Sequence, residues 1–377
     1  MAAITPQRVL HVLGGLDAGG VETLIMNFYR RLDVAKYQFD FAVHASHPCF
    51  YDGEALSRGA RIFYVPHPSR GGLLHFRRAF SKILGTAGPF AAVHSHVFHF
   101  SGYVLTVAKA AGVPIRISHS HTICGGRQPG WGRRLYRAAS RRLLFRNGTL
   151  LLGCTPAACQ ALYGIATGPR VRVLPNAIDI LRFDGARVRG TDLRNELGVG
   201  PETFLAGHVG RFSDVKNHER VIQVFAALRQ SVPGAALVLA GNGERFAAVQ
   251  ALAARMGLAG CVKFLGTRAD VPSILSALNL FLFPSHYEGL GMAVIEAQAA
   301  GIPSVVSDRV PLEADLGLGL VRFLPLAAEN GTWVRNALAA AGLPRPSWDD
   351  RLRQVRERGY DIYDAVQVLQ DLYANAR

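Results

Sequence analysis

Cysteine is scarce in this chain, which has five among its 377 residues. Their spacing fits neither a metal site nor a disulfide framework, and the odd count favours reduced thiols in a cytosol. No uninterrupted apolar run is long enough to span a bilayer, and the first residues lack the pattern of a secretory signal. We therefore expect a cytoplasmic protein whose contact with a membrane is peripheral.

Charged residues are also sparse, and the acidic ones most of all. Charged side chains make up 18% of the sequence, with 42 Lys and Arg against 27 Asp and Glu, so the formal net charge is +15. The apolar share of 49% allows a large core and excludes general disorder. The basic excess favours an anionic partner, which can be nucleic acid, an acidic membrane surface or a phosphorylated ligand.

Short β-rich runs alternate with helical stretches along the whole chain. In the first half we expect strands at 8–16, 39–44, 61–66, 91–97, 115–121, 149–155 and 170–175, with helices at 20–32, 74–86, 101–111 and 132–146. The pattern restarts with strands at 203–211, 235–241, 262–266, 280–285, 303–308 and 321–326, with helices near 217–231, 244–256, 270–278, 291–300 and 329–341. This alternation predicts an α/β protein with two Rossmann-like, doubly wound domains in tandem. Ligands of such sheets bind at loops beyond the carboxyl ends of the strands.

A glycine-rich turn, GGLDAGGVET, follows the first predicted strand and opens a helix. Gly19 and Gly20 allow close backbone approach, and the start of the helix offers free amides to a phosphate. The spacing is neither the dinucleotide fingerprint nor a P-loop. Anion binding and a simple tight turn both account for it.

Two later loops carry charged residues that could also bind a ligand. Arg211 and Lys216 lie between a strand and a helix, where two cations can clamp a diphosphate or can be solvated loop charges. Glu288 precedes the helix of 291–300 and Glu296 lies inside it. Carboxylates bind vicinal hydroxyl groups well, although a capping carboxylate and a surface glutamate are the plainer interpretations. The occurrence of all three motifs in order favours a ligand site.

With these motifs, the sequence resembles the retaining GT-B glycosyltransferases of family four, in particular the capsule and exopolysaccharide branch. The resemblance covers nearly the whole chain. Its most specific part is the combination of G-R-F-x-x-x-K at 210–216 with the E-x7-E pair at 288–296. It implies an acceptor-side domain at 1–178, a nucleotide-sugar domain at 179–359 facing it across a cleft, and a last helix within 360–377 that packs back on the first domain.

The resemblance also implies a role for each matching residue. Arg211 and Lys216 would hold the donor diphosphate, Glu288 would lie near the donor sugar and its leaving group, and Glu296 would bind the ribose. Backbone groups close to the donor would be those of Gly19, Gly20, Gly289, Leu290 and Gly291. A histidine of the HSH motif would lie near the donor sugar; both His119 and His121 fit, and we favour His119.

The implied reaction is transfer of a hexose-type sugar with retention and without an established side-chain nucleophile. The acceptor hydroxyl would attack from the face that the diphosphate leaves, so that catalysis rests on positioning and on stabilising the departing charge. UDP is the favoured carrier of the donor and GDP is the alternative. We expect no cofactor and no required metal, since cations and helix ends neutralise the diphosphate.

Histidines are unusually dense in the first half and permit a second interpretation. A zinc site could be formed by His94, His96, His99, His119 and His121, because two adjacent strands each end in an HSH motif. No acidic partner lies beside them, and the resemblance already explains one pair as lining of the donor site. We therefore expect no metal there.

The segment 125–148 is strongly basic, with arginines interleaved among Trp131, Leu135 and Tyr136 and no acidic residue. A basic amphipathic helix of this kind suits anionic headgroups. No nucleic-acid motif accompanies it, although a solvated surface helix would look similar. We expect contact with the inner face of the plasma membrane or with a lipid-diphosphate-linked saccharide acceptor through Arg133, Arg134, Arg137, Arg141 and Arg142.

The sequence thus predicts a glycosyltransferase of surface-polysaccharide assembly. A nucleotide-sugar epimerase of GT-B fold is one alternative, against which the E-x7-E context argues. A non-catalytic basic membrane adaptor is the other, and the intact set of charged motif residues argues against it. The donor sugar, the acceptor, the linkage and the oligomeric state stay open.

Overall fold

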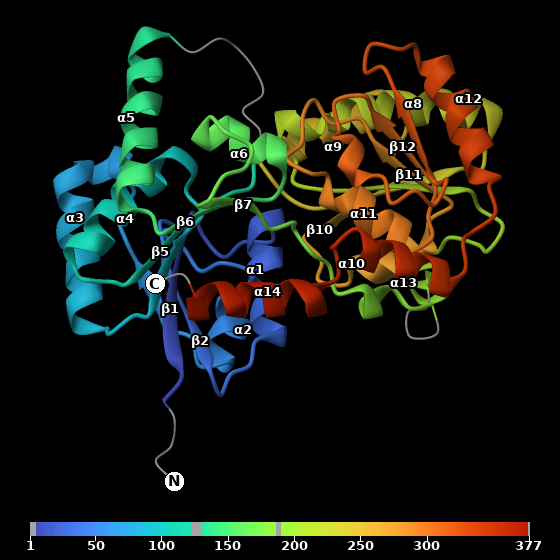
Figure 1. Ribbon diagram of the computed structural model, residues 1–377. Coiled ribbons are helices and arrows are strands. Elements are labelled where there is room, and N and C mark those ends of the chain that lie inside the picture. The colour runs from blue at the N-terminus through green and yellow to red at the C-terminus, as the bar shows by residue number, and fades with distance from the viewer. Residues whose placement is uncertain (1–4, 123–129, 186–189, 376–377) are drawn as a thin grey trace. The chain divides into compact units, whose positions relative to one another are not determined.

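The chain folds into two compact units. The computed structural model describes residues 5–122, 130–185 and 190–375. One unit comprises residues 1–177 together with 362–377, and the other comprises 178–361 (Figure 1).

The first unit is built on a parallel seven-stranded sheet in the order β3-β2-β1-β4-β5-β6-β7. The chain moves outward from β1 to β3 and then returns to β4, so β1 and β4 form the point where the strand order reverses. The strands are β1 (Gln7–Leu13), β2 (Tyr37–Val43), β3 (Ile62–Tyr64), β4 (Ala92–Ser95), β5 (Ile115–Ser120), β6 (Leu150–Gly153) and β7 (Val171–Val173).

Helices cover both faces of this sheet. One face carries α1 (Gly20–Arg31), α2 (Asp52–Ser57) and the C-terminal α14 (Ile362–Asn375), which packs on α1. The other face carries α3 (Pro68–Thr86), α4 (Ser101–Ala110), α5 (Trp131–Asn147) and α6 (Pro156–Tyr163). A short 3-10 turn, η1 (Phe98–Phe100), precedes α4.

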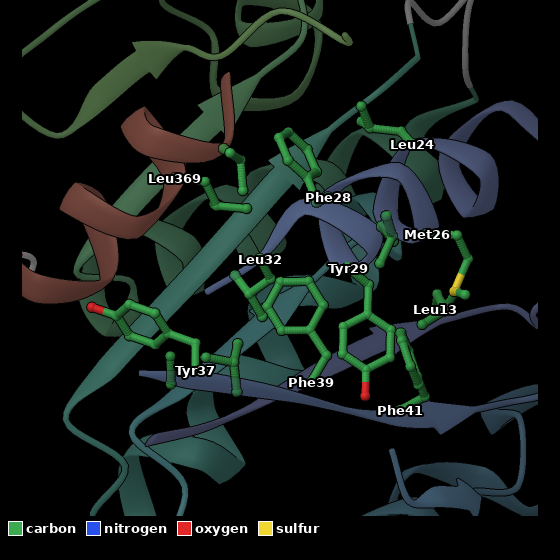
Figure 2. Packing of buried hydrophobic residues seen from close by; sticks show 14 of the residues in the cluster. Leu13, Leu24, Met26, Phe28, Tyr29, Leu32, Tyr37, Phe39, Phe41 and Leu369 are labelled. Atoms are coloured by element: carbon green, nitrogen blue, oxygen red, sulfur yellow. The ribbon is translucent and has the colours of Figure 1, made fainter. Parts of the chain in front are cut away.

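The core beneath α1 and α14 is rich in aromatic side chains. Tyr29 of α1 stacks on Phe39 of β2 with ring centroids 5.3 Å apart, and Leu369 of α14 is only 1% exposed. Figure 2 shows these side chains meeting between the helices and the sheet. The last helix therefore completes the core of the first unit, although the whole second unit, residues 178–361, precedes it in the sequence.

The second unit has a parallel six-stranded sheet in the order β10-β9-β8-β11-β12-β13, with the reversal between β8 and β11. Its strands are β8 (Leu205–Val209), β9 (Ala236–Ala240), β10 (Val262–Gly266), β11 (Leu280–Phe283), β12 (Ser304–Ser307) and β13 (Val321–Leu324). Its helices are α7 (Gly190–Glu196), α8 (His218–Ser231), α9 (Phe246–Arg255), α10 (Val271–Ala277), α11 (Met292–Ala299), α12 (Asn330–Ala341) and α13 (Trp348–Glu357). Short 3-10 turns lie at η2 (Ile180–Phe183), η3 (Asp214–Lys216) and η4 (Leu312–Ala314).

The structure confirms every strand that the sequence predicts and the long helices between them. The helices that sequence reasoning missed are short or strongly polar: α2, α6, α7 and α13. The start of α6 does carry a readable signal, since the Thr155 hydroxyl accepts a hydrogen bond from the Ala158 amide and Pro156 occupies the first turn.

Candidate functional site

The charged motifs of the second unit meet at the carboxyl ends of β8 and β11, the adjacent strands where the sheet order reverses. Two hydrogen bonds tie their loops together: the Asn217 side-chain amide donates to the Pro284 carbonyl at 3.1 Å, and the His286 amide donates to the Val215 carbonyl at 2.8 Å. Asn217 has a positive φ of 53° directly before α8. This turn sets the direction in which the loop of Lys216 returns toward β11.

The result is a close ion pair between two residues that are 72 positions apart. Lys216 Nζ lies 2.7 Å from Glu288 Oε1, with side chains only 21% and 11% exposed. The same ammonium group lies 4.7 Å from the centroid of the Phe283 ring, within cation–π range. Lys216 is thus held in place by a carboxylate and an aromatic face, and its positive charge is already shared with Glu288.

Arg211 lies on the same loop but is held differently. Its guanidinium pairs with Glu244 at 3.4 Å, and both side chains are mostly exposed. The aliphatic part of Lys216 lies against Gly210, where an added Cβ would come within 3.5 Å of Lys216 Cδ. The two cations therefore flank one short stretch of backbone. Lys216 is half-buried, and Arg211 lies in solvent.

The turn before α11 supplies backbone donors beside this pair. Gly291 has φ +89°, a conformation that favours glycine, and it caps α11 without a side-chain hydrogen bond. Leu290 is 2% exposed and Gly289 is half-buried. No side chain of the capping residue therefore occupies the first amides of α11, and these amides can donate to an anion.

Glu296 lies on α11 among buried neighbours and is itself half-buried. Burial raises the pKa of its carboxyl from 4.5 to about 7, although the positive charges of Arg182 and Lys216 act in the opposite direction. Glu296 is therefore not a surface glutamate, and the field of Lys216 reaches both acidic residues of the E-x7-E motif.

In the first unit, the glycine turn joins β1 to α1. Gly19 precedes α1, and the Glu22 carboxylate occupies the space that a Cβ at Gly19 would take. A Cβ at Gly20 would meet no atom within 4 Å, and Gly20 is exposed. Neither packing nor a positive φ accounts for glycine at position 20.

Five histidines gather at the carboxyl ends of β1, β4 and β5. His96 directly follows β4 and His121 directly follows β5. His11 Nδ1 lies 3.0 Å from His96 Nε2, His96 Nδ1 lies 2.9 Å from His121 Nε2, and His121 Nδ1 lies 3.1 Å from Asn176 Oδ1. Together these contacts form a continuous chain of hydrogen bonds.

The remaining two histidines pack beside this chain. The ring of His119 lies 4.0 Å from that of His121, and His94 Nδ1 lies 2.9 Å from the Tyr373 hydroxyl of α14. Burial lowers the pKa of His11 to about 3 and that of His121 to about 4. The pKa values of His94 and His119 fall in the same direction for the same reason. All of these rings are neutral at pH 7.

Sequence reasoning grouped His99 with these residues and missed His11. His99 instead packs against the rings of Phe98 and Tyr136. The signal for His11 was a histidine at the centre of an otherwise apolar strand, VLHVL. Phe283 and Asn176 were also missed, because only the folded chain shows which side chains lie under Lys216 and beside His121.

The basic segment forms α5, and its N-terminal half extends beyond the neighbouring helices of the first unit (Figure 1). Trp131 is 79% exposed and Leu135 is 61% exposed. Its arginines divide into exposed and partly buried ones: Arg133, Arg134 and Arg142 are exposed, while Arg137 and Arg141 are partly buried. Arg141 donates to the Leu162 carbonyl at the end of α6. The part of the segment at 125–129 lies outside the described residues.

Among the described residues, no helix has both the length and the apolar character that crossing a bilayer would demand.

Comparison with known proteins identifies the family. Residues 19–177 match the family described as "Glycosyl transferase 4-like domain", and residues 191–316 match "Glycosyl transferases group 1". EpsF of Bacillus subtilis (strain 168), which is named as a glycosyltransferase, is 37% identical over 369 residues, covering 97% of this chain and 96% of EpsF.

Two further similarities are informative. A protein of Escherichia coli named UDP-Gal:alpha-D-GlcNAc-diphosphoundecaprenol alpha-1,3-galactosyltransferase is 30% identical over 142 residues, 37% of each chain. The crystal structure of Anabaena HepE in complex with UDP-glucose has the same fold, with a TM-score of 0.74 at 19% identity over 97% of this chain and 99% of HepE. The protein therefore has the GT-B fold, belongs to the group 1 glycosyltransferases of family four, and is a glycosyltransferase.

Proposed function

We propose that this glycosyltransferase moves a hexose-type sugar, with retention, from a nucleotide diphosphate sugar to a lipid-diphosphate-linked saccharide in surface-polysaccharide assembly. UDP is the favoured carrier, with GDP as the alternative. The name of the Escherichia coli relative supports an acceptor of this class, and the UDP-glucose bound to HepE supports the donor class. The family assignment argues against both the epimerase and the non-catalytic adaptor.

The observation that carries the proposal is the Lys216–Glu288 pair at the reversal point of the second sheet. A donor diphosphate placed there would meet the ammonium group of Lys216 and the guanidinium of Arg211. The amides at Leu290 and Gly291, at the start of α11, would supply further donors. Glu296 would accept hydrogen bonds from the ribose hydroxyls.

In the proposed reaction, the bond between the sugar and the diphosphate breaks while the acceptor hydroxyl attacks from the same face. The proton of that hydroxyl passes to the departing phosphate oxygen, so no side chain has to act as nucleophile. Lys216 and the start of α11 stabilise the charge that develops on the diphosphate, and Glu288 orients the sugar. On this proposal the transfer needs no metal.

His119 is the histidine that we assign to the donor sugar. Both ring nitrogens of His121 are engaged, one with His96 and one with Asn176. The ring of His119 interacts with the Leu174 backbone, but neither of its nitrogens makes a hydrogen bond of normal geometry within the described part of the chain. His119 thus retains a nitrogen that it can offer to a ligand.

We further propose that α5 docks the enzyme on the inner face of the plasma membrane. Trp131 and Leu135 would enter the headgroup region, while the arginines meet anionic phosphates. Each arginine near such a surface contributes about 1 kcal/mol. Docking would bring the enzyme to a lipid-linked acceptor.

The donor proposal is tested by screening the purified protein against nucleotide sugars for thermal stabilisation and for release of the nucleotide. The double variant Arg211→Ala, Lys216→Ala should bind the selected nucleotide sugar at least tenfold more weakly. Arg255→Ala removes a cation from the last turn of α9, the end of the helix that leads into β10, and should leave the affinity for the nucleotide sugar unchanged. Unchanged affinity in the double variant would exclude binding of the donor diphosphate by Arg211 and Lys216.

The membrane proposal is tested with liposomes that contain phosphatidylglycerol. The double variant Arg133→Glu, Arg142→Glu should bind them at least tenfold less tightly at low salt. Arg77→Glu, Arg78→Glu on α3 makes the same change of charge on another exposed helix of the first unit. Equal losses in the two double variants would indicate attraction by net charge alone and would exclude docking through α5.

A further inference from the structure

Three of the gathered histidines are arranged as metal ligands are. His96, His119 and His121 each offer a ring nitrogen, and these atoms all lie within 4.8 Å of one another. His119 is buried, whereas His96 and His121 are half-buried. Contrary to the expectation from the sequence, we propose that these three residues bind one transition-metal cation, with Zn²⁺ as the first candidate, at a site that the glycosyl transfer does not require.

The hydrogen bonds around His121 orient it for this role. With the oxygen of the Asn176 amide facing it at 3.1 Å, His121 donates from Nδ1 and keeps a lone pair on Nε2. Metal-binding histidines typically donate their other N–H to an oxygen in this way, which fixes both the tautomer and the ring orientation. Nε2 of His121 is the atom that faces His96.

His119 supplies a second, independent indication. Its ring is 1% exposed and interacts with the Leu174 backbone, and neither nitrogen makes a hydrogen bond of normal geometry within the described ranges. A buried polar atom without a partner costs about 1–3 kcal/mol, so this position lacks the partner that it should have. A metal ion bound through one nitrogen would give that nitrogen the partner that it lacks, and the other nitrogen would stay with the Leu174 backbone.

The spacing is close to that of a zinc site. Zn–N bonds of about 2.0–2.1 Å in a tetrahedral arrangement place the ligand nitrogens about 3.3 Å apart. His96 Nδ1 and His121 Nε2 are 2.9 Å apart, where one proton is shared. A small opening of this contact and a rotation of His119 would admit the ion. Three protein ligands leave a fourth position for water or another small ligand.

The protons balance without net release. In the structure His96 donates from Nδ1, and its Nε2 accepts from His11 Nδ1, because Asn176 sets the direction of the whole chain. When a metal takes the lone pair at His96 Nδ1, the proton of His96 moves to its Nε2, which then donates to His11 Nδ1. The proton of His11 moves in turn to its own Nε2, and every imidazole stays neutral.

The ligand chemistry selects the kind of metal. Imidazole nitrogens without a carboxylate suit Zn²⁺, Co²⁺, Ni²⁺ and copper, whereas Mg²⁺, Ca²⁺ and Mn²⁺ prefer oxygen ligands. The site should therefore discriminate strongly between Zn²⁺ and Mg²⁺. This preference does not depend on the identity of the donor sugar.

The experiment uses the full chain without an affinity tag, stripped with a chelator and titrated with Zn²⁺, with Co²⁺ as spectroscopic probe. We expect one equivalent bound with a Kd below about 1 µM, visible absorption typical of tetrahedral Co²⁺, and no competition from millimolar Mg²⁺. His96→Gln and His121→Gln should each weaken Zn²⁺ binding at least tenfold.

His99→Gln is the matched control, since His99 is also a buried histidine of the first unit with unpartnered nitrogens but lies outside the group. Wild-type protein that binds no Zn²⁺, or equal losses in His99→Gln and His96→Gln, would overturn the proposal. The wild-type titration decides even where a variant fails to fold. Binding of nucleotide sugar, measured separately, distinguishes this outcome from failure of the proposed function.

Discussion

Replacing Glu288 by glutamine should make UDP bind more tightly while sugar transfer slows. In the structure Glu288 already holds Lys216, with 2.7 Å between carboxylate oxygen and ammonium nitrogen. A diphosphate that contacts Lys216 must therefore share this ammonium group with a neighbouring negative charge. Glutamine keeps the size of the side chain and removes that charge.

The magnitude follows from the geometry. A phosphate oxygen about 2.8 Å from Lys216 would lie about 5 Å from the Glu288 carboxylate, which repels it by about 0.8 kcal/mol in a water-like dielectric and about 3 kcal/mol at an effective dielectric constant of 20. An intermediate value near 1.4 kcal/mol corresponds to about tenfold in Kd. Lys216→Met should act in the opposite direction and weaken UDP by about tenfold or more.

The assay is calorimetric titration of UDP into the wild type, Glu288→Gln and Lys216→Met at low and high salt, together with turnover of the nucleotide sugar. Turnover in Glu288→Gln should fall by about 10²–10³, because a neutral amide replaces the carboxylate that we propose orients the reacting sugar. The gain in UDP affinity should shrink at high salt. Glu202→Gln, an exposed carboxylate before the amino end of β8, is the control. If UDP bound Glu288→Gln no more tightly than the wild type, the shared-charge reasoning would be refuted.

Three further outcomes are expected. The raised pKa of Glu296, about 7 against an ordinary 4.5, means that its ionisation opposes folding, so this residue costs stability progressively as the pH rises from 4.5 to 7. Glu296→Gln should therefore be more stable than the wild type above pH 7, by at most on the order of 3 kcal/mol, and a difference in melting temperature that does not grow with pH would contradict this. Leu369→Ala on α14 should destabilise the first unit by about 2–5 kcal/mol, measured by thermal unfolding, whereas Val368→Ala, 49% exposed on the same helix, should be nearly neutral. Gly20→Ala should leave the melting temperature unchanged, since its Cβ would enter open space, but should weaken nucleotide-sugar binding if the donor approaches there; a variant that unfolds would show that the glycine serves the backbone instead.

Local patterns in the chain carried much of the secondary structure and the order of the motifs. Runs such as LFLF and SVVS form buried strands. Helices cover both faces of a parallel sheet, so consecutive residues of its central strands are apolar. Alternation of these runs with amphipathic segments was enough for a doubly wound α/β fold. The short α6 and the polar α13 were missed, since a few turns of helix carry too little periodicity to stand out.

Partners far apart along the chain could not be found in this way. The sequence indicated both Lys216 and Glu288 as candidate site residues, but not their 2.7 Å contact. This contact arises because β8 and β11 are neighbours and because Asn217 turns the loop toward Pro284. His11 was overlooked because a single histidine in an apolar strand does not show which distant residues it will meet. Its meeting with His96 follows from the pairing of β1 with β4.

The residue order alone thus predicted the class of fold and the family, because these follow from periodicity and from motifs that are contiguous in the chain. It also singled out the charged residues that we propose as the donor site. Strand order and burial established which charges neutralise one another, which histidines share protons, and that Glu296 is half-buried on its helix. Such properties depend on distances and on the local dielectric, and both arise only when segments remote in sequence pack together.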